Sequence, residues 1–159
     1  MKVGFASLVG LPPIPLEEAV AWAAANGLQG IEVNTGPVYP FIDDGPIQGH
    51  LDLDRILTDG PESTRTLFDS HGIELTAIAP MINLLTSDLD LRAQRIEYMR
   101  QTIDAAAALG CPLVVTFTGS GHGMYFYGLP GVGDGHASNR VRDNLECFTE
   151  IYGPLAEQA

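Results

Sequence analysis

The chain has 159 residues, 45% of them hydrophobic, so it is long enough to bury a core and is not a disordered sequence. Its 20 acidic and 8 basic residues give a formal net charge of −12, which should repel the phosphate backbone of a nucleic acid and disfavours nucleic-acid binding. No apolar run reaches the about 18–20 residues of a membrane span, and no secretory signal begins the chain, so we expect a cytoplasmic protein without membrane or nucleic-acid partners.

The first predicted unit is a short strand followed by a helix. The strand covers residues 2–7, and a Gly- and Pro-rich stretch, residues 10–15, would end it. From Leu16 apolar residues recur every three or four positions until Gly27, which predicts an amphipathic helix between these two residues. The next apolar segment, residues 28–33, is too short for a helix and predicts a second strand.

A second helix and a third strand follow a turn-rich stretch. The helix is predicted over residues 61–71 and ends at Gly72, and residues 53–57 can add a helical turn before it. The third strand is predicted over residues 73–79.

The last two predicted helices flank a fourth strand. Ser87 is the expected N-cap of a long helix that ends at Gly110, and the strand covers residues 112–118. Pro154 is expected to kink or divide the final helix. The predicted buried face of that helix consists of Val141, Leu145, Phe148 and Tyr152.

Strands and helices thus alternate, and the strands are almost continuously apolar. Such strands form parallel sheets that helices cover, because parallel strands need crossover connections and are buried on both faces. The alternation fits an open doubly wound α/β sheet or a (β/α) barrel. The chain has no dinucleotide-binding fingerprint to support the open sheet. The two cysteines, Cys111 and Cys147, stand at core-like positions and are expected to be free thiols.

Four segments carry a resemblance to a known family; they are AVAWAAANGLQGIEVNTG, GIELTAIAPMINLL, RIEYMRQTIDAAAALGCPLVVTFTGSG and DNLECFTEIYGPLAEQA. The chain resembles the sugar phosphate isomerase/epimerase family, the xylose-isomerase-like TIM barrels, along essentially its whole length. The resemblance implies a parallel barrel of eight strand-helix units, typically about 250 residues. Since only four units are counted, residues 1–159 are expected to form the N-terminal (β/α)4 half of such a barrel, apparently truncated.

The resemblance also implies an activity. Members are expected to be metal-dependent isomerases or epimerases that move a proton of a sugar or sugar phosphate through an enediolate. The divalent metal (Mn, Mg, Co or Zn) is held in this family by two glutamates, an aspartate and a histidine, mainly on later strands. We therefore expect no metal ligands in this chain and no turnover by the chain alone, and a homo-oligomer or a missing C-terminal half both stay open.

Polar and aromatic residues at or after the strand ends are the candidates for a site, because function gathers at this end of a barrel. The predicted catalytic residues are Glu32 and His122, a carboxylate and a loop imidazole that can both exchange a proton. For Glu32 and Asn34 the alternative is a structural polar network. The residues predicted to contact substrate are Phe5, Asn34, Asn83 and Thr118.

Three other interpretations are weaker. A metal cluster of His50, His122 and His136 lacks the spacing of a metal motif. A nuclease like the endonuclease IV relatives of this superfamily is disfavoured by the net charge and by the lack of a histidine in the fourth strand. A noncatalytic half-barrel that dimerises or complements a partner would protect its open sheet edges.

Overall fold

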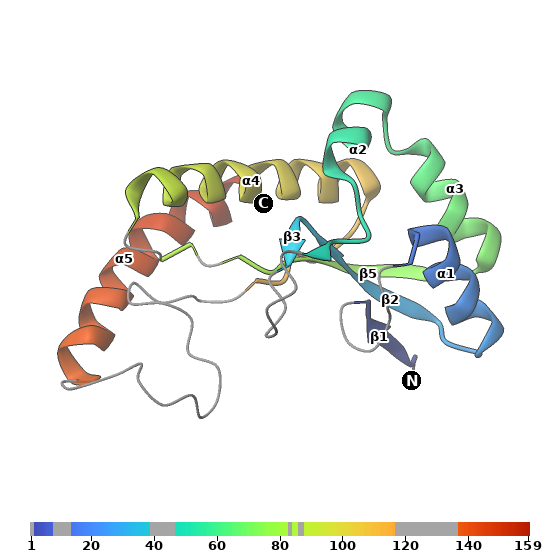
Figure 1. The fold of residues 1–159 in the computed structure, drawn as a ribbon, viewed down its shortest axis with the longest axis horizontal. Helices are drawn as coiled ribbons and strands as arrows, with labels where there is room; N and C mark the ends of the chain where they lie inside the picture. Colours follow the sequence, from blue (N-terminus) through green and yellow to red (C-terminus); the bar gives the residue numbers. More distant parts are fainter. Residues whose placement is uncertain (1, 8–13, 39–46, 83, 86–87, 117–136) are drawn as a thin grey trace. The chain divides into compact units, whose positions relative to one another are not determined.

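The computed structural model describes residues 2–7, 14–38, 47–82, 84–85, 88–116 and 137–159, which form an α/β structure (Figure 1). The chain folds into two compact units. The first consists of Met1–Met81 and Gln101–Thr116, and the second of Ile82–Arg100 and Phe117–Ala159. The predicted α/β class is therefore confirmed, and the candidate residues that the structure describes all belong to the first unit.

A parallel sheet is the centre of the first unit. Its strands are β1 (Gly4–Ala6), β2 (Gly30–Thr35) and β5 (Glu74–Pro80), in the order β1-β2-β5. Both pairs are parallel, as the alternation of strands and helices predicts. The fourth predicted strand is represented in the described residues by one bridge, which joins Val114 to Ile78, and residues 117–118 lie outside them.

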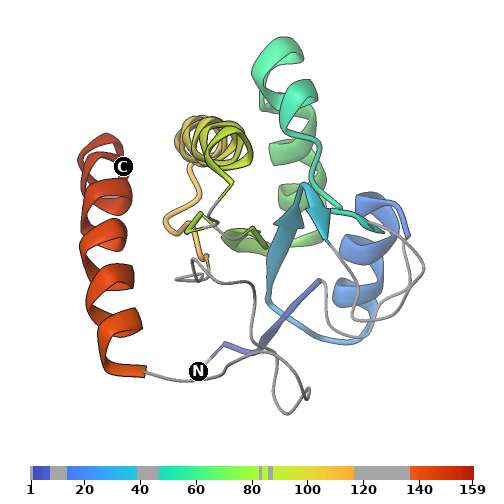
Figure 2. The same ribbon diagram turned by 60° about the vertical axis from the view of Figure 1, so that its left-hand side comes forward.

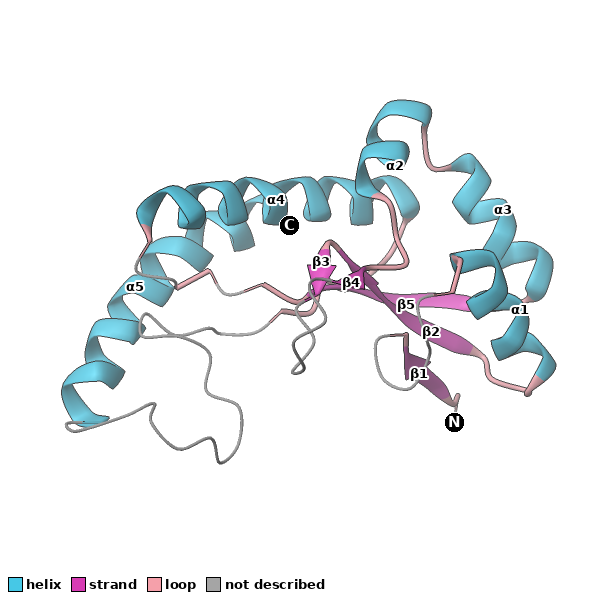
Figure 3. Ribbon diagram, viewed as in Figure 1, coloured by secondary structure: helices cyan, strands magenta, loops and turns pink. Residues whose placement is uncertain are grey.

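Helices cover one face of this sheet. In the first unit α1 (Leu16–Ala25), α2 (Leu53–Asp59) and α3 (Glu62–His71) follow the strands, and α1 and α3 lie side by side (Figures 2 and 3). The side chains of Ile31, Val33 and Ile78 are fully buried on the helix-covered face. Gly72 ends α3 with a φ of 65°, the left-handed geometry that glycine adopts without strain.

The second strand runs two residues later than predicted. Leu28 lies outside the sheet, because its N–H donates to the carbonyl of Ala23 at 3.0 Å and so caps the end of α1. At the other end, the polar residues Asn34 and Thr35 extend the strand because their side chains are hydrogen-bonded within the unit. Hydrogen bonding, which the hydrophobic pattern does not report, therefore sets both ends of β2.

The turn-rich stretch after β2 contains structure that the sequence did not predict. A short antiparallel pair joins β3 (Pro37–Val38) and β4 (Ile47–Gln48). The chain then returns to the end of β2, where Leu51 forms a parallel bridge with Thr35 and accepts a hydrogen bond from its hydroxyl at 3.0 Å. This return places the start of α2 beside the carboxyl end of β2.

The two long helices differ from their predictions in detail. The side chain of Asp88 accepts from the N–H of Leu91 at 3.0 Å at the start of α4 (Leu89–Leu109), and Ser87 lies outside the described residues. The helix α5 (Ala137–Gln158) continues through Pro154 and is not divided there. Proline removes only one N–H, and this one lies in the last turns of a 22-residue helix.

The buried face of α5 also differs from the predicted one. Leu145 is 61% exposed, whereas Ile151 and Leu155 are buried. Phe148 and Tyr152 are half-buried and stack on each other with ring centroids 4.3 Å apart. The predicted face of Leu145, Phe148 and Tyr152 is therefore wrong at Leu145, and Val141 lies among residues whose side chains are not described.

Both cysteines are free, as predicted, but they are half-buried and not in the core. Burial raises the pKa of the Cys111 thiol above its usual value of 9.0, and the backbone of Leu113 and Ile78 opposes this shift through hydrogen bonds. Because the native state keeps its proton to higher pH than the unfolded state, this thiol makes the protein less stable as pH rises past 9.0.

In a Cys147→Ser background we therefore expect the alkylation rate of Cys111 to rise at higher pH in the native protein than in the urea-unfolded protein. Iodoacetamide kinetics measured against pH in both states would check this, because the thiolate is the reacting form. Equal midpoints in the two states would contradict the role of burial.

Candidate functional site

The face of the sheet opposite the helix-covered one carries the candidate carboxylate. Side chains alternate along a strand, so Gly30, Glu32 and Asn34 of β2 lie on the face opposite the one that carries Ile31 and Val33, away from the helices. We call this face the inner face. A cavity of about 340 Å³ lies there, lined by Lys2, Val3, Gly4, Phe5, Ala6, Gln29, Gly30, Glu32 and Thr76.

Glu32 stands in the middle of β2, the third of its six residues, and not at the carboxyl end where the sequence placed it. Its register partners on the neighbouring strands are Ala6 of β1 and Ala77 of β5. These small side chains leave the half-buried carboxylate room to reach a molecule in the cavity. A carboxylate between two alanines can accept hydrogen bonds from hydroxyl groups or exchange a proton.

Asn34 joins three strand ends through hydrogen bonds. Its amide donates to the carbonyl of Ala79 on β5 at 3.0 Å, and its Oδ1 accepts from the hydroxyl of Ser7 at 3.4 Å. The hydroxyl of Ser7 also accepts from the backbone N–H of Asn34 at 3.1 Å. Asn34 is 1% exposed and hydrogen-bonded through both its amide nitrogen and its amide oxygen, as expected for the structural polar network that was the alternative to substrate contact. Its contact with a substrate stays a prediction.

The described part of the structure does not bring the other predicted site residues together. Phe5 borders the inner cavity, but its ring packs on Trp22 of α1 in a T-shaped pair with centroids 5.4 Å apart. Asn83, Thr118 and His122 lie outside the described residues. Of the six candidate residues, the structure therefore places Glu32, Asn34 and Phe5 on adjacent strands of one sheet.

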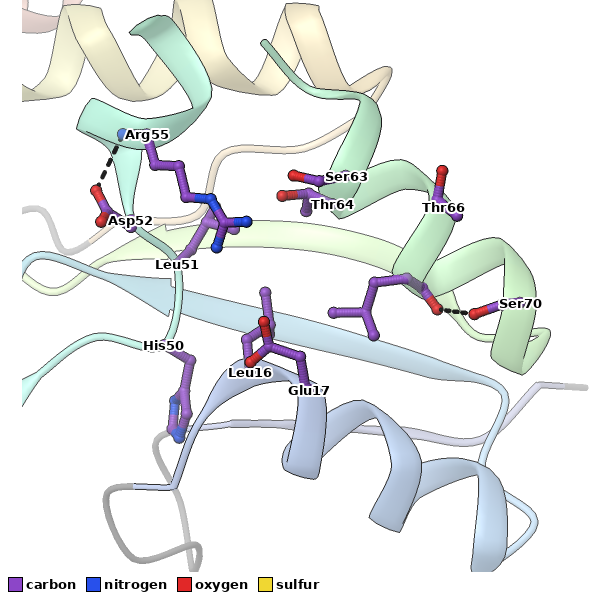
Figure 4. Close-up of a pocket in the computed structure, with 11 residues that line it drawn as sticks. Leu16, Glu17, His50, Leu51, Asp52, Arg55, Ser63, Thr64, Thr66 and Ser70 are labelled. Carbon is purple, nitrogen blue, oxygen red and sulfur yellow. Dashed lines mark hydrogen bonds between the residues drawn. The ribbon is translucent and has the colours of Figure 1, made fainter. Parts of the chain in front are cut away.

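A second cavity lies on the helix side of the unit, between α1, α2 and α3 (Figure 4). Its volume is about 360 Å³. Arg55 reaches it from α2 and Glu17 from α1 (Figure 4). The remaining lining residues are Leu16, His50, Leu51, Asp52, Ser63, Thr64, Thr66, Leu67 and Ser70.

This helix-side cavity was not predicted. Its polar wall comes from the hydroxyl residues Ser63, Thr64 and Thr66, which the sequence shows as the run ESTRT at the start of α3. Such a run is typical of a solvent-exposed helix surface. His50 lies here and not on the inner face, while His122 and His136, its partners in the weak metal-cluster interpretation, lie outside the described residues.

The described residues do not provide a metal centre. Among them no group of three or more His, Cys, Asp or Glu side chains is placed to hold a metal ion. On the inner face the cavity offers one carboxylate, that of Glu32, and a divalent cation in a protein site needs several such ligands. The donor set therefore does not fit a metal by itself.

Among the helices of the described segments, none has the length and apolar character of a membrane-spanning helix.

Comparison with known proteins identifies the fold. A model of the family described as xylose isomerase-like TIM barrel matches residues 20–155. No curated protein matches the sequence. Several solved structures do match, and each covers nearly all of this chain.

Three of these structures illustrate the similarity. The 3-keto-D-glucoside 4-epimerase from E. coli is 15% identical with a TM-score of 0.63, and the match covers 99% of this chain and 52% of that one. The probable 3-DHS dehydratase AsbF from Bacillus anthracis is 17% identical, with a TM-score of 0.59 and coverage of 99% and 49%. An L-ribulose 3-epimerase is 19% identical, with a TM-score of 0.58 and coverage of 99% and 46%. The chain thus spans about half the length of the structures it matches.

Proposed function

The chain belongs to the family of xylose isomerase-like TIM barrels, and on this premise we propose that it supplies one side of a site that isomerises or epimerises a sugar or sugar phosphate. The observation that carries the proposal is the family match over residues 20–155. Two of the similar structures are named as epimerases of a glucoside and of ribulose, which supports a carbohydrate as the substrate class. The complete barrel is proposed to use a divalent cation (Mn, Mg, Co or Zn), and among the described residues no group of three or more His, Cys, Asp or Glu is placed to hold it.

Glu32 is the proposed proton-transfer residue of this half. Isomerisation next to a carbonyl removes a proton from one carbon and returns one to the same or the neighbouring carbon. A carboxylate on the inner face, flanked by Ala6 and Ala77, can accept that proton or hold a substrate hydroxyl. His122 is proposed as a second proton-transfer group.

The substrate-binding residues are proposed to be Phe5, Asn34, Asn83 and Thr118. For Asn34 the hydrogen bonds to Ala79 and Ser7 also give it a positioning role, since they hold the ends of β1 and β5 beside β2. Such a network fixes the strands that carry the reacting groups and so supports the site from outside.

Ligand-detected NMR with a panel of ketoses, aldoses and their phosphates would test the proposal. We expect at least one sugar to bind the purified chain weakly, because the inner-face cavity of about 340 Å³ can hold part of a sugar ring. With added Mn²⁺ we expect no epimerised product from the chain alone.

Two outcomes would contradict these expectations. Failure of every sugar in the panel to bind would remove the support for a carbohydrate site. Turnover of a ketose by the purified chain would instead show that its own residues complete the catalytic set. Glucose-free buffer and an unrelated acidic protein of similar size serve as controls for nonspecific signals.

A further inference from the structure

The pairing of β2 with β5 is irregular at one residue of β5. Ile31 of β2 stands opposite Leu75 of β5. The next residue of β2, Glu32, stands opposite Ala77, so Thr76 is an extra residue between two register pairs. Such a β-bulge is rare between parallel strands, and bulges are over-represented next to active sites, where they redirect a side chain. The bulge at Thr76 lies beside the carboxylate that the proposed function uses.

The bulge turns two consecutive side chains of β5 to the inner face. Ile78 is buried on the helix-covered face, so Ala77 before it lies on the inner face. Thr76 lies there too, because it lines the inner-face cavity and its Cγ2 methyl group is 2.6 Å from the position that a Cβ atom on Gly30 would take. The bulge thus adds a hydroxyl group to the inner face and keeps the alanine that leaves room for Glu32.

The hydroxyl of Thr76 and the carboxylate of Glu32 are two polar groups of this cavity that are open to a ligand. Both residues are half-buried, and in the part of the chain that the structure describes neither side-chain group makes a hydrogen bond. Two other polar side chains of the cavity are already engaged, since the Oε1 of Gln29 accepts from a backbone N–H at 2.8 Å and Lys2 pairs with Glu74 at 2.5 Å. A carboxylate accepts and a hydroxyl both donates and accepts, so the pair matches two hydroxyl groups of a polyol.

We propose that Thr76 is a further substrate-binding residue of the sugar site, a role that rests on the proposed function. Its hydroxyl holds one sugar hydroxyl while the carboxylate of Glu32 holds another. Because the two groups are fixed on neighbouring strands, they favour sugars whose two hydroxyls have the matching configuration, and Thr76 thereby helps to select the sugar. Gly30 permits this placement, since a larger residue there would displace the methyl group of Thr76.

Replacing Thr76 with valine tests the contact. Valine keeps the shape of threonine and its methyl group over Gly30 but lacks the hydroxyl. For a sugar that binds the unaltered chain, we expect ligand-detected NMR titrations to show an affinity roughly three- to ten-fold lower, the effect of losing one neutral hydrogen bond. Thr76→Ser keeps the hydroxyl and is expected to bind within about two-fold of the unaltered chain. Equal affinities of Thr76→Val and the unaltered chain would overturn the proposal.

Deoxy analogues of the same sugar separate a direct contact from a structural role. Each analogue lacks one hydroxyl, and the analogue without the hydroxyl that Thr76 binds has nothing further to lose in Thr76→Val. We expect this analogue to bind the variant and the unaltered chain equally, while the other analogues lose the same factor as the parent sugar. A uniform loss for every analogue would show that Thr76 acts only through the shape of the sheet and would refute the contact.

Gly30→Ala supplies an independent variant. The added Cβ atom would stand 2.6 Å from the methyl group of Thr76 and must displace this side chain, so we expect weaker sugar binding. Thr76→Ser removes that methyl group, and the double variant is therefore expected to bind like Thr76→Ser alone. Gly153→Ala, whose Cβ atom meets nothing within 4 Å, is the control for the loss of a glycine. A double variant that does not regain binding would contradict the placement of Thr76 on which the proposal depends.

The same titrations distinguish a failure of the Thr76 contact from a failure of the sugar site, once far-UV circular dichroism has established that each variant is folded. If no ketose, aldose or sugar phosphate of the panel binds the unaltered chain, the proposed function and the role of Thr76 both fall. If a sugar binds the unaltered chain and is weakened by Glu32→Gln but not by Thr76→Val, the site stands and only the role of Thr76 is overturned.

Discussion

Replacing Ile78 with alanine is expected to lower the free energy of unfolding by about 2–5 kcal/mol. The side chain is 0% exposed on the helix-covered face, opposite Val33 of β2, and its backbone joins β5 to the segment around Val114. Truncation leaves a cavity where two strands and the helix layer meet, and a close-packed core relaxes only partly around such a space. Urea unfolding followed by circular dichroism at a fixed protein concentration measures the loss.

Leu57→Ala is the matched control for this prediction. It removes a similar number of carbon atoms from a side chain of α2 that is 44% exposed, so the expected change is within about 0.5 kcal/mol. Similar losses for the two variants would show that the side chain of Ile78 is not at the core of the first unit.

The periodicity of apolar residues predicted the order of β1, α1, β2, α3, β5, α4 and α5, but not the short pair β3 and β4. The helix from Leu16 and its end before Gly27, and the helix that Gly72 ends, are confirmed within one or two residues. These elements obey local rules, since an amphipathic face needs burial and a left-handed residue at a helix end favours glycine. The parallel order β1-β2-β5 follows from the same alternation.

The features that the sequence did not predict depend on contacts between distant residues. The extension of β2 through Asn34 relies on Ser7 and Ala79, which are 27 and 45 residues away. Leu145 was expected to be buried because it belongs to an apolar stripe of the helix. The stripe alone does not determine which of its residues contact the core. The helix-side cavity combines residues of three helices, and no local motif marks it.

The largest expected effect on function follows from replacing Glu32 with glutamine. We expect the affinity for a sugar of the panel to fall roughly ten- to hundred-fold, because hydrogen bonds to a charged group contribute about 1.5–3 kcal/mol. Glutamine keeps the size of the side chain, so the flanking residues Ala6 and Ala77 need not move. Titration by ligand-detected NMR measures the change, and circular dichroism establishes that the variant is folded.

Glu18→Gln is the control that separates this effect from the change in net charge. Glu18 is exposed on α1, which covers the other face of the sheet, and its replacement removes the same single negative charge. We expect sugar binding by this variant to equal that of the unaltered chain. If Glu32→Gln binds as tightly as Glu18→Gln, the carboxylate on the inner face makes no contact with the sugar, and the proton-transfer role proposed for Glu32 must be abandoned. A loss confined to Glu32→Gln would instead place the sugar against the middle of β2, two residues before Asn34, so that the strand interior and not the loops alone would hold the substrate.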